Sequence, residues 1–176
     1  MRILKWLLGI VVGLAVVFVA GGMLLPRNVD IARSIEIDAP PEAVFPHVNS
    51  LKAAEAWSPW LGLDPDVALT YEGPDEGVGA KLAWQSEHPN VGNGKQEITL
   101  SEENARVETA LDFGDMGTAT ASYVLVEKGG GTEITWGLGL DMGAGPVGRW
   151  FGLMMDGQVG ADYETGLQNL KALVEG

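Results

Sequence analysis

The hydrophobic pattern of the chain begins with an uninterrupted apolar block. Residues Trp6 to Leu25 carry no charged or polar side chain over 20 positions. As a helix rising 1.5 Å per residue, the block is about 30 Å long, which matches the hydrocarbon thickness of a bilayer. The pattern predicts one transmembrane helix, so that residues 1–26 form an anchor and residues 27–176 form a separate domain.

The residues that flank this block predict its orientation. Arg2 and Lys5 lie on its short side, whereas Arg27 and Arg33 on the other side are offset by Asp30. The positive-inside tendency then places the N-terminus in the cytoplasm. We expect a single-pass protein of the cytoplasmic (inner) membrane with its domain in the periplasm or outside the cell. A cleaved signal peptide is the alternative, although the block exceeds the usual ~7–15 apolar residues of such peptides.

Beyond the anchor, short runs that alternate polar and apolar residues or are rich in β-formers predict strands. Glycine-rich turns separate most of these runs, and crossover helices are missing between them, which favours consecutive hairpins in a bent antiparallel sheet. The predicted strands are Arg33–Asp38, Val67–Glu72, Ala80–Gln85, Lys95–Leu100, Arg106–Phe113, Ala119–Val126 and Glu133–Leu140.

Helical periodicity appears in three other places. The segments Glu42–Leu51 and Lys52–Trp57 predict two short helices after the first strand. Val147–Glu175 predicts a long C-terminal helix, with a break or bend expected at Asp156-Gly157 or Gly160. This order predicts an α+β fold of the helix-grip type. A curved antiparallel sheet of about seven strands would wrap the C-terminal helix and leave a cavity between them.

Composition and charge exclude several classes of function. The net charge is −13, and from Pro26 onward nine Lys and Arg face 24 Asp and Glu, so the domain repels phosphate backbones and no nucleic acid is expected. The chain has no cysteine, which rules out disulfides, thiolate nucleophiles and thiolate metal sites. Asp64-Pro65-Asp66 and Asp75-Glu76 lack the spacing of a calcium loop. We expect no metal and no cofactor.

Several segments together resemble one protein family. In order and spacing they are similar to the polyketide cyclase/dehydrase branch of the START-like SRPBCC superfamily, from about Ile35 to Glu175. The segments are Pro41–Phe45, Trp57–Trp60, Tyr71–Pro74, Gly77–Ala80 with Trp84, Gly92–Gly94, Gly145–Phe151 and Gly166–Lys171. The resemblance implies a helix-grip fold around a pocket for lipids, sterols or aromatic polyketides. It does not imply catalysis, because no catalytic residue of the family falls on a matching position.

Aromatic and methionine side chains supply the candidate ligand-binding residues. Such side chains can line a pocket for a flat or apolar ligand, and an indole N–H or phenol O–H can orient it. Core packing is the alternative role for each of them. The candidates are Trp57, Trp60, Tyr71, Trp84, Trp136, Trp150 and Met154.

Candidate acid–base groups are few. His47 lies in the first predicted helix, and Glu97 and Asp112 lie in predicted strands, where one of them could face the interior. Exposed positions are the alternative for all three, because a register shift of one residue moves a strand carboxylate to the solvent face.

The leading hypothesis is a membrane-anchored domain that binds a small hydrophobic molecule. A protein-interaction module that docks through its acidic surface is one alternative, with its protein partner unknown. A cyclase, dehydratase or hydrolase that uses His47 or a buried carboxylate is the other. A cavity free of titratable groups would argue against the enzyme, and a core without a cavity would favour the interaction module.

Overall fold

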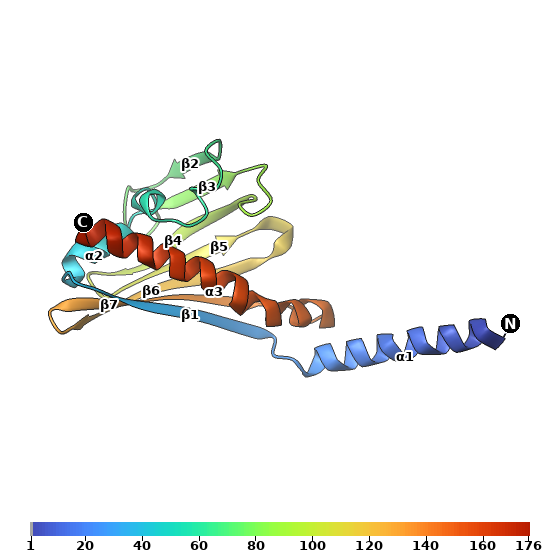
Figure 1. Cartoon of the computed structure of the whole chain (residues 1–176). Coiled ribbons are helices and arrows are strands. Elements are labelled where there is room, and N and C mark those ends of the chain that lie inside the picture. Colours follow the sequence, from blue (N-terminus) through green and yellow to red (C-terminus); the bar gives the residue numbers. More distant parts are fainter. Residues whose placement is uncertain (1) are drawn as a thin grey trace.

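The computed structural model describes residues 2–176 as an N-terminal helix followed by one α+β domain (Figure 1). The helix α1 (Arg2–Leu24) extends away from the domain. Its segment Lys5–Leu24 has a mean hydropathy of 2.6, and nearly all of it is exposed. By length and composition, this segment could cross a bilayer.

Seven strands form a single antiparallel sheet in the order β1-β7-β6-β5-β4-β3-β2. Every neighbouring pair is antiparallel, and each predicted strand is present, so the predicted sheet is confirmed. The strands are β1 (Asn28–Ile37), β2 (Ala68–Glu72), β3 (Lys81–Gln85), β4 (Gly94–Glu102), β5 (Arg106–Asp112), β6 (Thr118–Lys128) and β7 (Gly131–Asp141).

Strand β1 begins five residues earlier than the sequence predicted. It pairs with β7 over its whole length, from Asn28 opposite Asp141 to Ile37 opposite Thr132. Because β7 is 11 residues long, it provides hydrogen-bonding partners for residues that local pattern alone left unassigned. Only residues 25–27 therefore separate α1 from the sheet.

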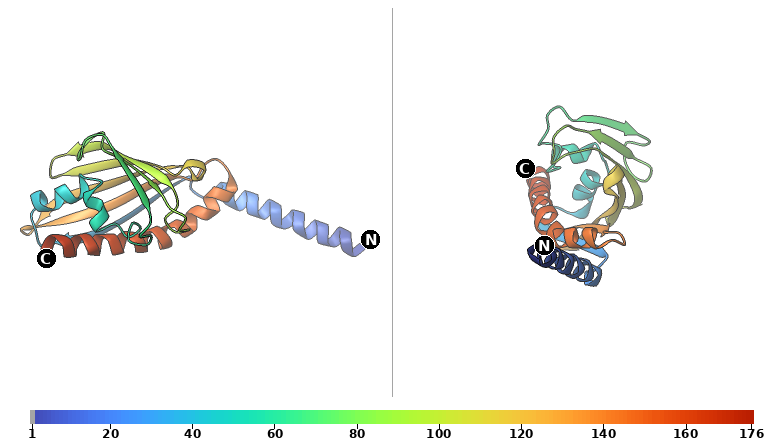
Figure 2. Two further views of the ribbon diagram at one scale, coloured as in Figure 1. Left: turned by 90° about the horizontal axis from the view of Figure 1, so that it is seen from above. Right: turned by 90° about the vertical axis from the view of Figure 1, so that its right-hand side faces the viewer.

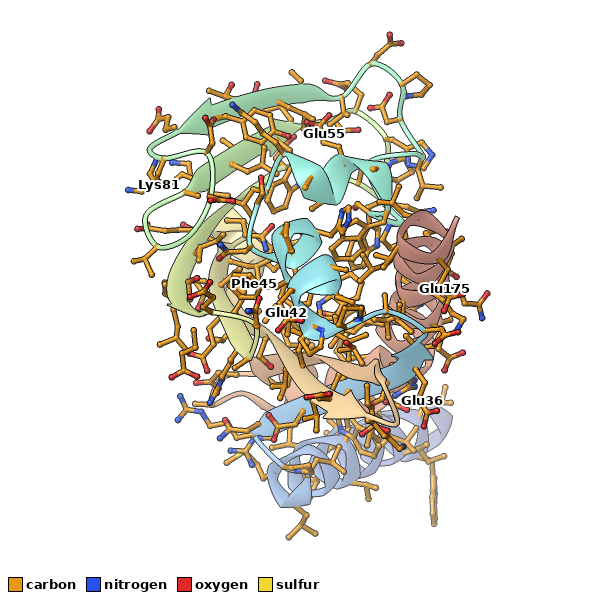
Figure 3. All side chains as sticks on the ribbon, turned by 90° about the vertical axis from the view of Figure 1, so that its left-hand side faces the viewer. Glu36, Glu42, Phe45, Glu55, Lys81 and Glu175 are labelled. Carbon is orange, nitrogen blue, oxygen red and sulfur yellow. The ribbon has the colours of Figure 1, made fainter. Side chains whose placement is uncertain are left out.

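The remaining helices cover the concave face of the sheet and one of its ends (Figure 2). The helix α2 (Pro41–Val48) begins with a proline and ends three residues before the predicted end, and a 3₁₀ turn, η1 (Ala53–Ala56), follows it. Another 3₁₀ turn, η2 (Gly114–Met116), joins β5 to β6. Figure 3 shows α2 at the end of the sheet that lies far from α1, where Phe45 is buried.

The long helix α3 (Pro146–Glu175) is continuous over 30 residues and has no break, and its axis bends, which is the other of the two expected outcomes (Figure 2). At Gly160 the helix packs directly on the guanidinium group of Arg33, where a Cβ atom would lie 2.0 Å from Nη2. Arg33 Nε donates to Glu164 Oε1 at 2.9 Å and Nη1 donates to Asp156 Oδ1 at 3.1 Å. The glycine thus allows close packing of the helix on β1.

Aromatic rings fill the core between α3 and the sheet. The rings of Trp136 on β7 and Tyr163 on α3 stack with centroids 3.8 Å apart. Gly166 allows this approach, because a Cβ atom there would lie 2.7 Å from the Trp136 ring. Trp57 packs edge-on against Trp136 and donates its indole N–H to the carbonyl of His47 at 3.0 Å.

A network of contacts holds the end of α1 against the start of α3. Trp150 stacks on Phe18 with ring centroids 5.8 Å apart and donates its indole N–H to the Phe18 carbonyl at 2.9 Å. Arg149 Nη1 donates to the carbonyls of Met23 and Leu25 at 2.8 and 3.1 Å. The orientation of α1 relative to the domain is therefore set by packing.

Replacement of the central indole should strongly destabilise the domain. Trp136 is 4% exposed, so we expect Trp136→Ala to lower the free energy of unfolding by about 3–5 kcal/mol. Leu173→Ala, at a position 42% exposed on α3, should change it by only about 0.5 kcal/mol. Denaturation of the full chain in detergent, followed by near-UV circular dichroism, measures both. Equal losses for the two variants would contradict this account of the core.

The ion pair beside the anchor predicts a pH dependence. Arg27 Nε donates to Asp141 Oδ1 at 2.7 Å, and this bond, with a second from the backbone of Gly143, lowers the pKa of Asp141 to about 2. A carboxyl whose pKa is lower in the folded state stabilises the fold above its ordinary pKa and loses that contribution as the pH falls. Wild type should therefore exceed Asp141→Asn in melting temperature at pH 6, and most of the difference should be lost as the pH falls from the ordinary aspartate pKa of about 4 to about 2. A difference that stays constant over this range would contradict the assignment.

Candidate functional site

Three of the predicted ligand-binding residues belong to one aromatic cluster. Trp57 and Trp60 contact Trp136 edge-on, with ring centroids 5.2 and 5.8 Å away, and Tyr123 and Tyr163 complete the cluster. Trp60 also donates its indole N–H to Asp162 Oδ2 on α3 at 3.2 Å. The stacked rings leave no space for a ligand between them, so this cluster closes off one end of the interior.

Trp84 lies on the same face of the sheet but outside this cluster. Its ring meets Phe113 edge-on at 6.0 Å, and its indole N–H donates to the carbonyl of Val91 at 3.3 Å. Gly94 allows the Trp84 ring to lie against the backbone of β4, because a Cβ atom at position 94 would lie 2.4 Å from that ring. Trp84 is only half-buried, so it remains available to a ligand.

Tyr71 lies on the edge strand β2 and is tied to η1. Its hydroxyl donates to Glu55 Oε1 at 2.6 Å, and Lys52 Nζ lies 5.7 Å from the centre of its ring. Burial and the adjacent Glu55 raise the pKa of the Tyr71 phenol, so it stays protonated at neutral pH. These contacts give Tyr71 a role in fixing η1 to the sheet.

The structure does not bring the last two predicted residues to this interior. Trp150 packs against Phe18 of α1, and Met154 is 59% exposed on α3. Helical periodicity placed both on the apolar side of α3, but the sequence could not show that α1 would cover Trp150.

Burial changes along the concave face of the sheet, which is the face that packs against α3. Near α2 its side chains are fully buried, as at Ile98, Val107 and Ile134. Toward α1 and η2 several apolar or amide side chains are only half-buried, although Ile31 and Ala119, which lie among them, are buried. We call this second group the open half of the concave face, and it consists of Trp84, Gln96, Leu111, Phe113, Leu138 and Leu140.

The strand register places these residues side by side. Leu140 lies opposite Ala119, Ala119 lies opposite Leu111, and Leu111 lies opposite Gln96. Sequence reasoning missed Leu111, Leu138 and Leu140 as candidate site residues, although alternation in β5 and β7 placed them on one face. Which inward-facing residues stay half-buried depends on the path of α3, and strand patterns carry no information about that path.

A few polar groups lie among these apolar side chains. Gln96 Nε2 donates to Thr109 Oγ1 at 3.0 Å, and the buried Trp136 Nε1 has no hydrogen-bond partner among residues 2–176. Burial raises the pKa of both Tyr123 and Tyr163, so their phenols stay protonated. The interior can therefore exchange hydrogen bonds with a neutral polar group, and it offers no charged side chain from these positions.

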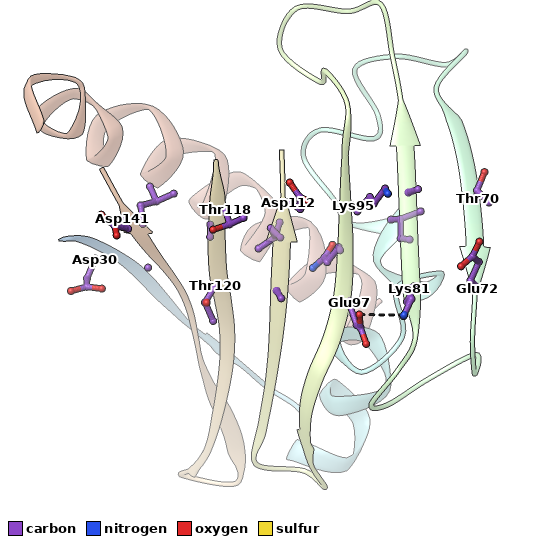
Figure 4. A pocket seen from close by; sticks show the side chains of 18 of the residues that line it. Asp30, Thr70, Glu72, Lys81, Lys95, Glu97, Asp112, Thr118, Thr120 and Asp141 are labelled. Atoms are coloured by element: carbon purple, nitrogen blue, oxygen red, sulfur yellow. Dashed lines mark ion pairs between the residues drawn. The ribbon is translucent and has the colours of Figure 1, made fainter. Parts of the chain in front are cut away.

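The candidate acid–base residues lie elsewhere. Glu97 pairs with Lys81 at 3.4 Å on the convex face, and Asp112 lies on the same face (Figure 4). Both therefore take the solvent-face alternative and neither faces the interior, because the register of β4 and β5 turns them away from α3. His47 is half-buried on α2, beyond the aromatic cluster, and it is the backbone carbonyl that contacts Trp57.

The convex face itself carries a wide hollow of about 830 Å³ (Figure 4). Charged side chains of both signs line it, including Glu72, Lys81, Lys95 and Asp112. This lining does not suit an apolar ligand. In the part of the chain that the structure describes, no three His, Asp or Glu side chains come together as a metal site.

Comparison with known proteins agrees with this architecture. The sequence profile described as "Polyketide cyclase / dehydrase and lipid transport" matches residues 28–175. No curated protein sequence gives a significant match.

Solved structures share the fold at low sequence identity. CalU16 from Micromonospora echinospora is 18% identical, with a TM-score of 0.57 over 82% of this chain and 75% of CalU16. The Aha1 dimer from Colwellia psychrerythraea is 17% identical, with a TM-score of 0.56 over 84% and 96% of the two chains. Ara h 8.0201 is 12% identical, with a TM-score of 0.61 over 84% and 97%. The profile match over most of the chain shows that this protein belongs to the polyketide cyclase/dehydrase and lipid transport family of the SRPBCC superfamily.

Proposed function

We propose that this protein is a membrane-anchored domain that binds a small hydrophobic molecule without converting it. The observation that carries the proposal is the open half of the concave face, where apolar side chains such as Leu111, Leu138 and Leu140 remain half-buried. An inward-facing apolar surface that the protein's own helix leaves partly uncovered is suited to an apolar ligand. The family's description, which includes lipid transport, supports the same class of ligand.

Apolar burial alone supplies enough free energy for such binding. At about 25 cal/mol per Å², removal of about 300 Å² of ligand surface from water contributes about 7 kcal/mol before ordering costs. Trp84 and Phe113 add an aromatic edge to the site, which suits a flat ring or an acyl chain. The aromatic cluster around Trp136 limits how far a ligand can reach toward α2.

One polar contact can orient the ligand. Gln96 belongs to the open half, and its amide nitrogen donates a hydrogen bond to the hydroxyl of Thr109, whose side chain is fully buried. A ligand hydroxyl or carbonyl can join this pair, because an amide has a further donor and acceptor to offer. We therefore favour a ligand with one neutral polar end and an apolar body.

Chemical conversion has little support from the described side chains on this face. The six residues of the open half include no carboxylate, imidazole or amine, and Glu97 and Asp112 face the other way. General acid–base catalysis needs a titratable group within hydrogen-bonding reach of the reacting atom. We propose binding, transport or sensing of the ligand.

The apolar helix α1 supplies the proposed membrane anchor. With three residues between α1 and β1, the domain is held at the membrane surface, where apolar molecules are concentrated. The basic residues on the short side of α1 favour a cytoplasmic N-terminus, which places the domain in the periplasm or outside the cell.

Native mass spectrometry with organic extraction tests the proposal on the full chain in detergent. We expect a small-molecule adduct that is lost in Ala119→Phe, because Ala119 lies between Leu111 and Leu140 and a phenyl ring there fills the open half. Thr120→Phe is the matched control, since Thr120 is the next residue of β6 and faces the convex hollow. The control should keep the adduct.

Lipid bound to α1 would be retained in the wild type and in both variants. Its retention distinguishes it from a ligand bound in the domain. Circular dichroism spectra should show that both variants are folded. Absence of any domain adduct after incubation with lipids and aromatic compounds would overturn the proposal. That result, together with one stoichiometric protein partner, would support the interaction module instead.

A further inference from the structure

We propose that the first two turns of α3, residues 147–154, enter the membrane interface beside α1. The end of the domain next to α1, which contains the open half of the concave face, would then contact the bilayer. This inference rests on the proposed membrane anchor and goes beyond it, since a tethered domain need not touch lipid. The partner that covers this exposed helix face would be the lipid bilayer.

The segment is exposed and apolar. Val147 is 68% exposed, Phe151 55%, Leu153 57% and Met154 59%. Four large apolar side chains within eight residues of an otherwise acidic domain are unusual for a surface that faces water, and such patches mark contact with a protein or a membrane.

The contacts with α1 fix the depth of this segment. Trp150 reaches the carbonyl of Phe18, which lies six residues, or about 9 Å along the helix axis, before the end of α1 at Leu24. At Gly21 a Cβ atom would lie 2.8 Å from the Trp150 ring, so the two helices are in close contact there. If Lys5–Leu24 crosses the bilayer, Trp150 lies about 9 Å inside the end of the span, within the depth of about 5–10 Å to which the apolar faces of interfacial helices are buried.

At the junction one guanidinium group meets the end of α1, although its buried Nε, in Arg149, has no hydrogen-bond partner among the described residues. The last carbonyls of a helix have no partner within the helix and must find another donor when they are removed from water. Arg149 donates to the carbonyls of Met23 and Leu25, and so it supplies that donor at the end of α1. Arg149 is also the one charged residue between positions 147 and 154.

The charge pattern favours apolar insertion over attraction to anionic lipid. The domain is strongly acidic, and its nearby Arg27 is already paired with Asp141. A zwitterionic bilayer should therefore be sufficient, whereas a polybasic surface would require anionic lipid.

Insertion of residues 147–154 into the interface would bring the open half of the concave face close to lipid. The start of α3 and the turn η2 lie at the end of the domain next to α1 (Figures 1 and 2). Met116 in η2 is 78% exposed at that end. A hydrophobic ligand could then pass between the bilayer and the concave face with little exposure to water.

Site-directed spin labelling of the full chain in phosphatidylcholine nanodiscs tests this inference. The chain has no cysteine, so single-cysteine variants carry one label each. Phe151→Cys and Met154→Cys report on α3, and Val12→Cys reports on the anchor. Val126→Cys is the matched control, because Val126 is 53% exposed on β6.

We expect labels at positions 151 and 154 to be several-fold more accessible to oxygen than to a water-soluble nickel chelate, as at position 12, while position 126 shows the reverse. Labels at 151 and 154 that behave like position 126, or that are shielded from both reagents as in a protein contact, would overturn the inference and leave the anchor intact. Access of the nickel chelate to position 12 would overturn the anchor and this inference together.

Discussion

The packing of α3 across the concave face of the sheet is the contact on which the rest of the structure depends. It is closest where Tyr163 stacks on Trp136, with ring centroids 3.8 Å apart, and where Gly160 rests on Arg33. These contacts bury the half of the concave face near α2 and leave the other half only partly covered. One helix thus sets both the core and the position of the proposed ligand site.

The same helix connects the proposed site to the proposed anchor. Its first turns bind the end of α1 through Trp150 and Arg149, and only residues 25–27 link α1 to β1. A domain held by two such connections cannot rotate freely about its tether. The end of the domain that is least buried is therefore also the end held next to α1, which suits exchange of apolar molecules with a membrane.

Local pattern was enough to predict the antiparallel sheet and the long C-terminal helix, because alternation and glycine-rich turns report on strand faces and hairpins. It could not predict the start of β1, which depends on pairing with β7 about 100 residues away. The face of the sheet on which Glu97 lies depends on the strand register. The packing of Trp150 depends on Phe18 of α1, which local pattern does not place beside it. The candidate site was predicted only in part, because half-burial of Leu111 and Leu138 results from tertiary packing.

Methyl NMR of the full chain in lipid nanodiscs tests the central claim most directly, with naphthalene as an aromatic probe. If the open half of the concave face binds apolar molecules, nuclear Overhauser effects should join the naphthalene protons to the methyl groups of Leu111, Leu138 and Leu140. The methyls of Val126, at an exposed position, and of Val107, in the packed core, should show none. Effects confined to the methyls of α1 would place the probe in the membrane alone and contradict the account.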